Sequence, residues 1–193
     1  GSLSYSSVIP IGAKNVTNDL AIGLRVSLES SEKIKIMLSD VQKSKKDESD
    51  EVDLSVLDLP EVKKISKKTL VEGIIKPRLN EIFSIVRLEL EREGLSGRIP
   101  SGAIITGGGA ETAGCLESAK RTLSLPIRIG KPQGVGGLID DIMTPAYATG
   151  TGLIIYAAHS LSNEPLTSFT KKLKLPTKGI AGKIVNIIKD LLP

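Results

Sequence analysis

Three consecutive glycines, Gly107–Gly109, follow a short apolar run and precede a segment predicted to begin a helix near Ala110 and Glu111. The run at 103–106 is typical of a buried strand. Glycines let the main chain approach a ligand closely, and the first N–H groups of a helix favour a phosphate. An ordinary strand-to-helix turn has the same sequence, because glycines there relieve steric strain. The turn is therefore a candidate phosphate or nucleotide site, and a plain turn is the alternative.

Two charged residues further upstream share one face of a predicted helix. Glu32 and Lys35 are three residues apart, so both side chains can contact the same ligand. The alternative is a surface ion pair contributing about 0.2–0.5 kcal/mol.

Composition excludes several other kinds of chemistry. A single cysteine, Cys115, excludes a disulfide framework and a cysteine metal site. A single histidine, His159, argues against a histidine metal site and a Ser-His-Asp triad, so we expect neither a catalytic residue nor a metal ligand. Aromatic residues make up 3% of the chain and tryptophan is absent, which argues against nucleic acid as a partner. We find no signal peptide and no apolar run of membrane-spanning length, and we expect a cytoplasmic protein.

The excess of positive over negative charge is confined to the C-terminal part. The net charge is +4, and all of it comes from residues 160–193, which contain six lysines and two acidic residues. Residues 161–178 contain Pro165 and Pro176 and are predicted to be a flexible basic linker. Residues 179–193 predict an amphipathic helix. Its apolar face consists of Ile180, Ile184, Ile187, Ile188, Leu191 and Leu192, and Lys183 and Lys189 lie on the polar face. Such a helix binds a membrane surface or docks on protein; the linker before it favours the membrane.

The hydrophobic pattern predicts a mixed α/β chain. We expect strands at 3–11, 103–106 and 126–129 and an antiparallel strand pair at 52–59 and 62–65. Helices are predicted at 18–28, 32–41, 68–94, 112–123 and 146–158. Thr17 or Asn18, Ser30 or Ser31, and Ser66 are the expected N-caps of the first three helices. Pro77 should kink or split the longest helix, and Gly94 should end it.

An ordered set of motifs resembles a known family. The motifs are V-I-P-I-G-x-x-x-V-T-N-D-L-A at 8–21, S-E-K-I-K at 31–35, P-R-L-N-E-I-F at 77–83, A-I-I-T-G-G-G-A at 103–110, P-I-R-I-G at 126–130 and T-P-A-Y-A-T-G-T-G-L-I-I-Y-A at 144–157. Together they resemble the second half of the bacterial cell-division protein family FtsA, across residues 3–160. The resemblance implies the second half of an actin/Hsp70-like ATPase fold. Residues 1–16 and 96–160 would form subdomain 2A, and residues 17–95 an inserted subdomain 2B.

The resemblance also implies an ATP site. Gly107, Gly108, Gly109 and Ala110 match the adenosine-side loop, and Glu32 and Lys35 match positions that approach the ribose and the adenine. Both phosphate-binding turns of the family and its metal-side carboxylate have no counterpart in this sequence. The site for ATP with Mg is therefore incomplete, and we expect this chain alone to bind ATP weakly and not to hydrolyse it.

Partners follow from the same resemblance. Arg78 and Glu81 match positions near the surface where the family binds the C-terminal tail of the tubulin-like protein FtsZ. Other FtsA subunits and anionic membrane lipids are the further partners, and the location is the cytoplasmic face of the membrane at the division site. The implied function is an adaptor that tethers FtsZ filaments to the membrane and self-polymerises. A PilM-like pilus-assembly actin homologue and a small-molecule kinase of the same superfamily are the alternatives.

Overall fold

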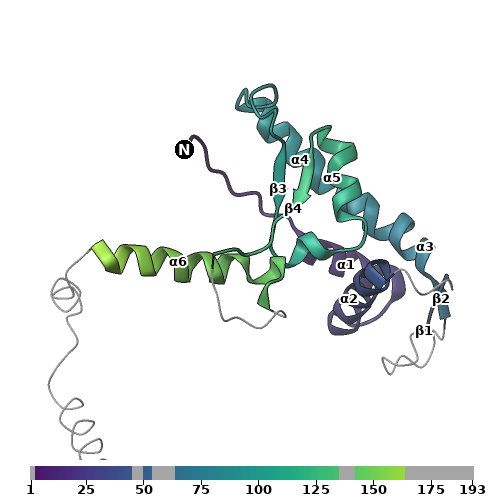
Figure 1. Ribbon diagram of the computed structural model, residues 1–193. Coiled ribbons are helices and arrows are strands. Elements are labelled where there is room, and N and C mark those ends of the chain that lie inside the picture. The colour runs from purple at the N-terminus through teal and green to yellow at the C-terminus, as the bar shows by residue number, and fades with distance from the viewer. Residues whose placement is uncertain (1–2, 45–49, 54–63, 135–141, 164–193) are drawn as a thin grey trace, which may run out of the picture. The chain divides into compact units, whose positions relative to one another are not determined.

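The computed structural model describes residues 3–44, 50–53, 64–134 and 142–163 (Figure 1). The chain divides into two compact units, Gly1–Thr151 and Gly152–Pro193. In the second unit, the described residues are the part of α6 (Ala148–Asn163) that follows Thr151. Leu153, Ile154 and Tyr156 on this helix are more than 60% exposed.

Two small sheets form among the described residues of the first unit. Strand β1 (Glu51–Asp53) pairs antiparallel with β2 (Lys64–Ser66), with Val52 opposite Ile65. This confirms the predicted strand pair where it is described, and residues 54–63 lie outside the described part. Strand β3 (Ala103–Ile105) pairs parallel with β4 (Ile127–Ile129), and α5 (Cys115–Leu123) lies between them in the chain. The predicted strands at 103–106 and 126–129 are therefore confirmed to within a residue.

The expected strand at 3–11 is wrong. Residues 3–9 have no regular secondary structure, and the side chains of Leu3 and Val8 are 85% and 90% exposed. No strand of the described chain pairs with this segment, so its alternating pattern has no sheet to join. Tyr5 and Ser7 instead donate hydrogen bonds to one carboxylate oxygen of Glu89 (2.6 and 2.9 Å).

The first two helices begin earlier than predicted. Helix α1 (Ala13–Leu24) starts after Gly12, whose amide donates to the Asn15 side chain (3.0 Å). Helix α2 (Leu28–Ser44) starts after Ser27, whose hydroxyl accepts from the Ser30 amide (3.1 Å). The expected caps thus lie inside the helices, because Gly12 and Ser27 accept hydrogen bonds from the first amides instead. These misplaced caps are Thr17 or Asn18 in α1 and Ser30 or Ser31 in α2.

The long helix is divided at Pro77, as predicted. Helix α3 (Lys67–Leu70) begins after Ser66, whose hydroxyl accepts from the Thr69 amide (3.1 Å). A π-helical turn, η2 (Val71–Ile75), separates it from α4 (Lys76–Arg92), in which proline occupies the first turn. Pro77 has no N–H, and a wider turn directly before it accommodates the missing hydrogen bond. Gly94 follows α4 with φ +65°, the left-handed conformation expected of a glycine stop.

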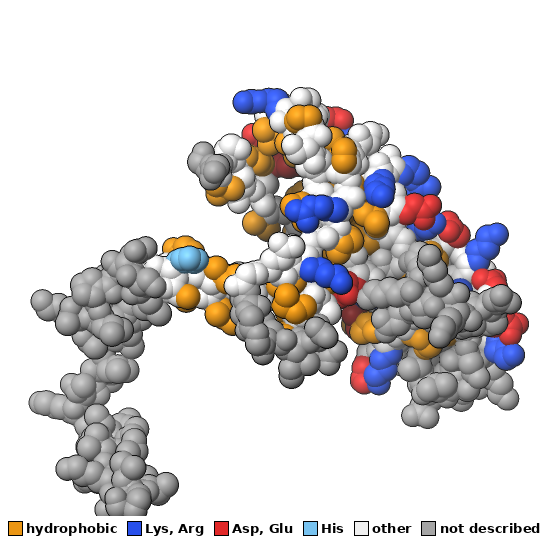
Figure 2. Space-filling view, in the orientation of Figure 1, with side chains coloured by type: hydrophobic (Ala, Val, Ile, Leu, Met, Phe, Trp, Pro, Cys, Tyr) orange, Lys and Arg blue, Asp and Glu red, His pale blue; other side chains and the backbone are white. Residues whose placement is uncertain are grey.

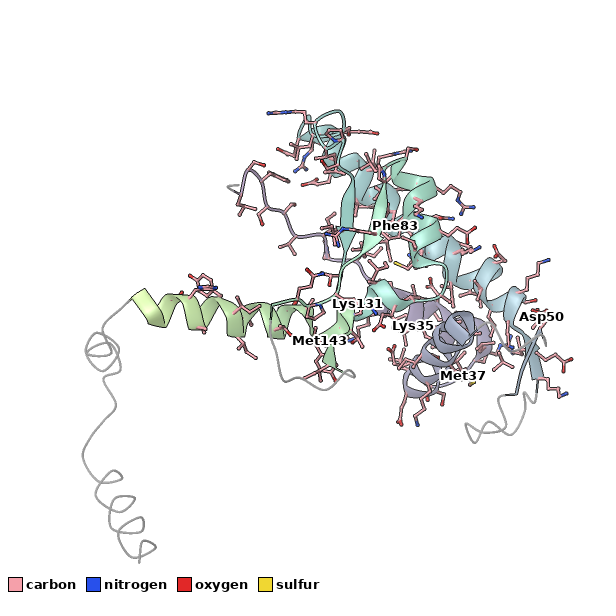
Figure 3. The ribbon with its side chains drawn as sticks, in the orientation of Figure 1. Lys35, Met37, Asp50, Phe83, Lys131 and Met143 are labelled. Atoms are coloured by element: carbon pink, nitrogen blue, oxygen red, sulfur yellow. The ribbon has the colours of Figure 1, made fainter. Side chains whose placement is uncertain are left out.

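One hydrophobic core holds these elements together. Leu20 from α1, Ile34 from α2, Leu70 from α3, Leu79 from α4 and Ala119 from α5 are all buried in it. Phe83 of α4 and Met37 of α2 are labelled in Figure 3; Phe83 belongs to this core, and Met37 packs against it. The α-helices α1 to α5 therefore each contribute buried side chains to the same interior.

Candidate functional site

Glu32, Lys35 and Thr17 form a compact cluster, called here the Glu32 cluster, between α2 and α1. The Lys35 ammonium donates to Glu32 Oε2 (2.7 Å), to Thr17 Oγ1 (2.9 Å) and to the Ala13 carbonyl (3.5 Å). Thr17 also donates to Glu32 Oε2 (2.5 Å). The Lys35 side chain is 10% exposed, whereas that of Glu32 is 45% exposed. Lys35 therefore points into the protein, and Glu32 presents the accessible part of the cluster.

The Glu32 cluster keeps its carboxylate ionised. Burial disfavours the charged form of Glu32, but hydrogen bonds from Lys35 and Thr17 outweigh burial and lower the pKa of Glu32 below its ordinary value of 4.5. A cavity of about 460 Å³ opens beside it, and Lys14, Asn18 and Leu28 contribute to its wall. Glu32 thus offers a fixed anionic acceptor for hydroxyl donors in that cavity.

The glycine turn takes a different form from the one predicted. Gly107 has φ +89°, and a 3-10 turn, η3 (Gly108–Glu111), follows it. Helix α5 begins only at Cys115, after Gly114 with φ +77°. The expected helix start at Ala110–Glu111 is wrong, because a second glycine break intervenes before the helix.

The glycines serve different purposes. A Cβ on Gly109 would lie 2.9 Å from the Ala13 Cβ, so this glycine is needed for close packing on α1. Gly107 needs glycine for its positive φ, and a Cβ there would meet nothing within 4 Å. The Gly107 amide donates to the Pro145 carbonyl (2.9 Å), which fixes the turn against η5 (Pro145–Tyr147).

Ala13 connects the two predicted parts of the site. Its carbonyl faces the Lys35 ammonium, and its Cβ faces Gly109. The first turn of α1 therefore lies between the Glu32 cluster and the glycine turn. Gly109 follows Ala13 by 96 positions and Lys35 by 74 positions in the sequence, yet the three residues belong to one neighbourhood.

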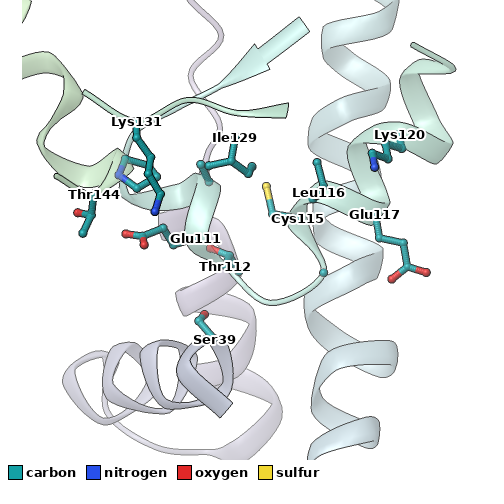
Figure 4. A pocket seen from close by; sticks show the side chains of 13 residues that line it. Ser39, Glu111, Thr112, Cys115, Leu116, Glu117, Lys120, Ile129, Lys131 and Thr144 are labelled. Carbon is teal, nitrogen blue, oxygen red and sulfur yellow. The ribbon is translucent and has the colours of Figure 1, made fainter. Parts of the chain in front are cut away.

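A larger cavity, about 690 Å³, lies on the other side of η3 (Figure 4). Figure 4 shows Glu111 and Lys131 on one side of it, Cys115 and Leu116 of α5 on the other, and Ser39 of α2 near its base. Ser39 lies one helical turn after Lys35, and its hydroxyl accepts from the Ala113 amide (3.2 Å). Helix α2 thus reaches both cavities.

Cys115 is the one cysteine of the chain and lines this cavity. Burial raises the pKa of its thiol to about 11, so it stays protonated at neutral pH. The residue behaves as a small apolar side chain and is no nucleophile.

A second charged group, called here the Arg78 cluster, consists of Arg78, Asp19 and Glu81. Arg78 Nε and Nη2 donate to the two carboxylate oxygens of Asp19 (2.5 and 2.9 Å), and Nη1 donates to Glu81. Hydrogen bonds to Asp19 raise the pKa of Arg78 further. The cluster borders a cavity of about 280 Å³ at the junction of η2 and α4.

Comparison with known proteins identifies the family. The family model of Cell division protein FtsA matches residues 1–152, well over half of the chain. The chain belongs to the FtsA family. FtsA membership implies the actin-like, ATP-binding fold, and the described residues form a mixed arrangement of helices and sheets.

Three relatives of the FtsA family show what share of their own length the chain matches. Cell division protein FtsA of Pseudomonas aeruginosa is 35% identical over 164 residues, covering 84% of this chain and 39% of the relative. The Neisseria meningitidis protein is 32% identical over 166 residues (86% and 40%). The Bacillus subtilis protein is 31% identical over 160 residues (83% and 35%). The chain therefore spans about two fifths of the length of the FtsA relatives it matches.

The predicted site residues of this FtsA-family chain fall into separate places. Glu32, Lys35 and Gly109 meet around Ala13, and Ala110 lines the larger cavity. Arg78 and Glu81 lie together in the Arg78 cluster. The predicted membrane residues at 180–192 lie outside the described residues. Within the described part of the chain, no three His, Cys, Asp or Glu side chains are placed to hold a metal ion, and no helix there has the length and hydropathy to cross a membrane.

Sequence reasoning missed Thr17, Asp19 and Ser39. Thr17 and Asp19 are part of the V-T-N-D-L-A motif of α1. Because they are two positions apart, they lie on different faces of this helix, and Thr17 contacts α2 whereas Asp19 contacts α4. Ser39 follows Lys35 by four residues, which is the one signal that could have placed it on the same face of α2.

Proposed function

We propose that this chain is part of an actin-like cell-division adaptor that binds ATP, docks the C-terminal tail of FtsZ and attaches filaments to the membrane. Membership of the FtsA family carries the proposal, because the family name itself specifies cell division. In this proposal residues 1–16 and 96–160 form subdomain 2A and residues 17–95 form subdomain 2B. Residues 161–178 are the linker and residues 179–193 the membrane helix.

The Glu32 cluster fits the adenosine side of an ATP site. Glu32 is ionised, oriented by two hydrogen bonds and still 45% exposed, which suits an acceptor for ribose hydroxyls. Lys35 donates hydrogen bonds to Glu32, Thr17 and Ala13, so it orients Glu32 beside the cavity that both side chains line. The space where a Cβ of Gly107 would lie is open, which suits a close approach of the nucleoside. ATP with Mg, once bound to the whole protein, would supply the energy of phosphoryl transfer.

The chain alone lacks the phosphate side of that site. Its 193 residues contain no D-x-G turn to hold phosphates or a metal-bound nucleotide. We therefore expect weak ATP binding and no hydrolysis by this chain. Heteronuclear NMR titration with ATP should shift amides near Ala13, Glu32 and Gly107 with millimolar affinity.

The matched control is another carboxylate. Glu32→Gln should remove the ATP-induced shifts, whereas Glu91→Gln, on the exposed face of α4, should leave them intact. Micromolar affinity for the unaltered chain, or equal loss in both variants, would contradict the assignment.

The Arg78 cluster is the proposed docking site for the FtsZ tail. An arginine guanidinium at the edge of a small cavity is suited to a carboxylate of an acid-containing peptide. Arg78→Glu should abolish binding of an FtsZ tail peptide in fluorescence anisotropy. Arg87→Glu reverses a charge on the same helix, away from the cavity, and should leave the affinity within about twofold.

The tail at 179–193 is proposed to bind the inner face of the membrane at the division site. Six aliphatic side chains contribute about 1.5–3 kcal/mol each when fully buried and less at an interface. Each nearby lysine adds about 1 kcal/mol against anionic lipid. The sum supports reversible binding, which association with other FtsA subunits would strengthen. Vesicles with anionic lipid should sediment the whole chain and not a version lacking residues 179–193; equal sedimentation would refute this.

A further inference from the structure

The two carboxylates of the Arg78 cluster hold the guanidinium with unequal strength. Asp19 accepts two hydrogen bonds in a bidentate pair, and its side chain is 25% exposed. Glu81 accepts from one nitrogen, and its side chain is 52% exposed. A bidentate, half-buried pair is stronger than a single contact open to water. Glu81 is therefore the partner of Arg78 that is released more easily.

The charge of the cluster raises a difficulty for any acidic ligand. Arg78 contributes one positive charge, and Asp19 and Glu81 contribute two negative charges, so the net charge is −1. An incoming carboxylate gains nothing from long-range attraction here and is repelled by like charge at short range. Binding of an acidic peptide thus requires that one intramolecular carboxylate leave the guanidinium.

We propose that Glu81 is a place-holder for the peptide's carboxylate, and that Asp19 holds Arg78 in position while the exchange occurs. This inference rests on the proposed docking of an acid-containing peptide at Arg78. On binding, the carboxylate of the peptide takes the Nη1 hydrogen bond, and Glu81 turns into solvent. Glu81 therefore opposes peptide binding, although it lies inside the docking surface.

The adjoining cavity defines the rest of the ligand. Ile74 and Pro77 give it apolar walls, and a Cβ on Gly73 would meet nothing within 4 Å, so this wall has free space. A volume of about 280 Å³ accommodates one aliphatic side chain. The ligand is thus a peptide with an acidic residue beside an aliphatic one.

The test is a peptide titration with opposite expectations for the two carboxylates. The probe is a fluorescein-labelled FtsZ tail peptide, titrated with the 193-residue chain. Glu81→Gln should tighten binding by about 2- to 5-fold, because an exposed competing ion pair is removed. Asp19→Asn should weaken binding by about 10-fold or more, because the guanidinium loses its bidentate anchor.

A second peptide separates exchange from other effects. With the acidic residues of the peptide changed to amides, Glu81→Gln should give no gain, because nothing then competes for Arg78. Arg78→Lys keeps the positive charge but cannot make bidentate hydrogen bonds, so it should weaken binding of the acidic peptide. This variant serves as the check if Asp19→Asn lowers the folded fraction.

The outcomes distinguish two failures. Weaker binding by Glu81→Gln, or a gain that persists with the amide peptide, would overturn the place-holder role and leave docking at Arg78 standing. Binding of the acidic peptide that is insensitive to Arg78→Glu would refute the docking site itself, and with it this inference.

Discussion

Replacement of Lys35 by methionine tests whether Lys35 serves the protein by holding Glu32. Methionine keeps the apolar stem, so the change removes the ammonium and its hydrogen bonds to Glu32 and Thr17. Breaking a fully buried pair costs about 3–5 kcal/mol and losing an exposed pair about 0–1 kcal/mol. Lys35 is 10% and Glu32 45% exposed, so solvent screens part of the loss, and we expect about 2 kcal/mol.

The measurement is urea unfolding of the two proteins across pH. The pKa of folded Glu32 lies below its ordinary 4.5, so its contribution to stability is complete above that value. It is lost as the pH falls from about 4.5 through the lower folded pKa. The difference between wild type and Lys35→Met should therefore be largest at neutral pH and shrink in acid. A melting temperature lower by about 4–8 °C at pH 7 is the thermal counterpart.

The control is Lys33→Met on the same helix. Lys33 pairs with Glu29 at 2.8 Å, but both side chains are more than half exposed, so the loss should stay below about 0.5 kcal/mol. Equal losses for the two variants would show that the buried position of Lys35 adds nothing. A loss that is unchanged down to about pH 2.5 would show that packing, and not the carboxylate of Glu32, is responsible.

Three further outcomes are expected from the geometry. Gly109→Ala should lower the free energy of unfolding by about 1–3 kcal/mol in urea titrations, because its Cβ would crowd Ala13, whereas Gly108→Ala should change it by less than about 0.5 kcal/mol. Cys115 should resist Ellman's reagent at pH 8 in the folded chain and react at once in denaturant; fast reaction of the native protein would contradict a buried, protonated thiol. Ser66→Ala should cost about 1 kcal/mol through loss of the helix cap, and an unchanged melting curve would refute that role.

Local signals predicted the elements whose ends depend on one residue type. Ser66, Pro77 and Gly94 each impose a backbone requirement that neighbouring residues cannot override, and the structure has a cap, a break and a stop at those positions. The segment at 3–11 failed for the opposite reason. Its alternation specifies a face, but a strand also needs a neighbouring strand, and no property of the segment itself reveals whether one exists.

The spacing of the sequence predicted one pair of the candidate site but not its other contacts. The spacing of Glu32 and Lys35 placed them together, and the structure pairs them. That Lys35 turns inward toward Thr17 depends on the packing of α1 against α2, which a helical repeat does not encode. The bidentate pair of Arg78 with Asp19 joins residues 59 positions apart, so no local pattern could reveal it.

The π-helical turn η2 acts as a one-residue insertion within an otherwise regular helix. Leu70 and Ile75 are five positions apart, yet both are buried, whereas Ile75, Leu79 and Phe83 follow at the usual spacing of four. Deleting Gly73, whose absent side chain touches nothing, would bring Leu70 and Ile75 to the α-helical spacing of four and restore a continuous α-helix with both residues on the same face. Leu70 would therefore stay in the core. The wider turn thus compensates for the extra residue, so that the buried faces of α3 and α4 stay aligned along one helix axis.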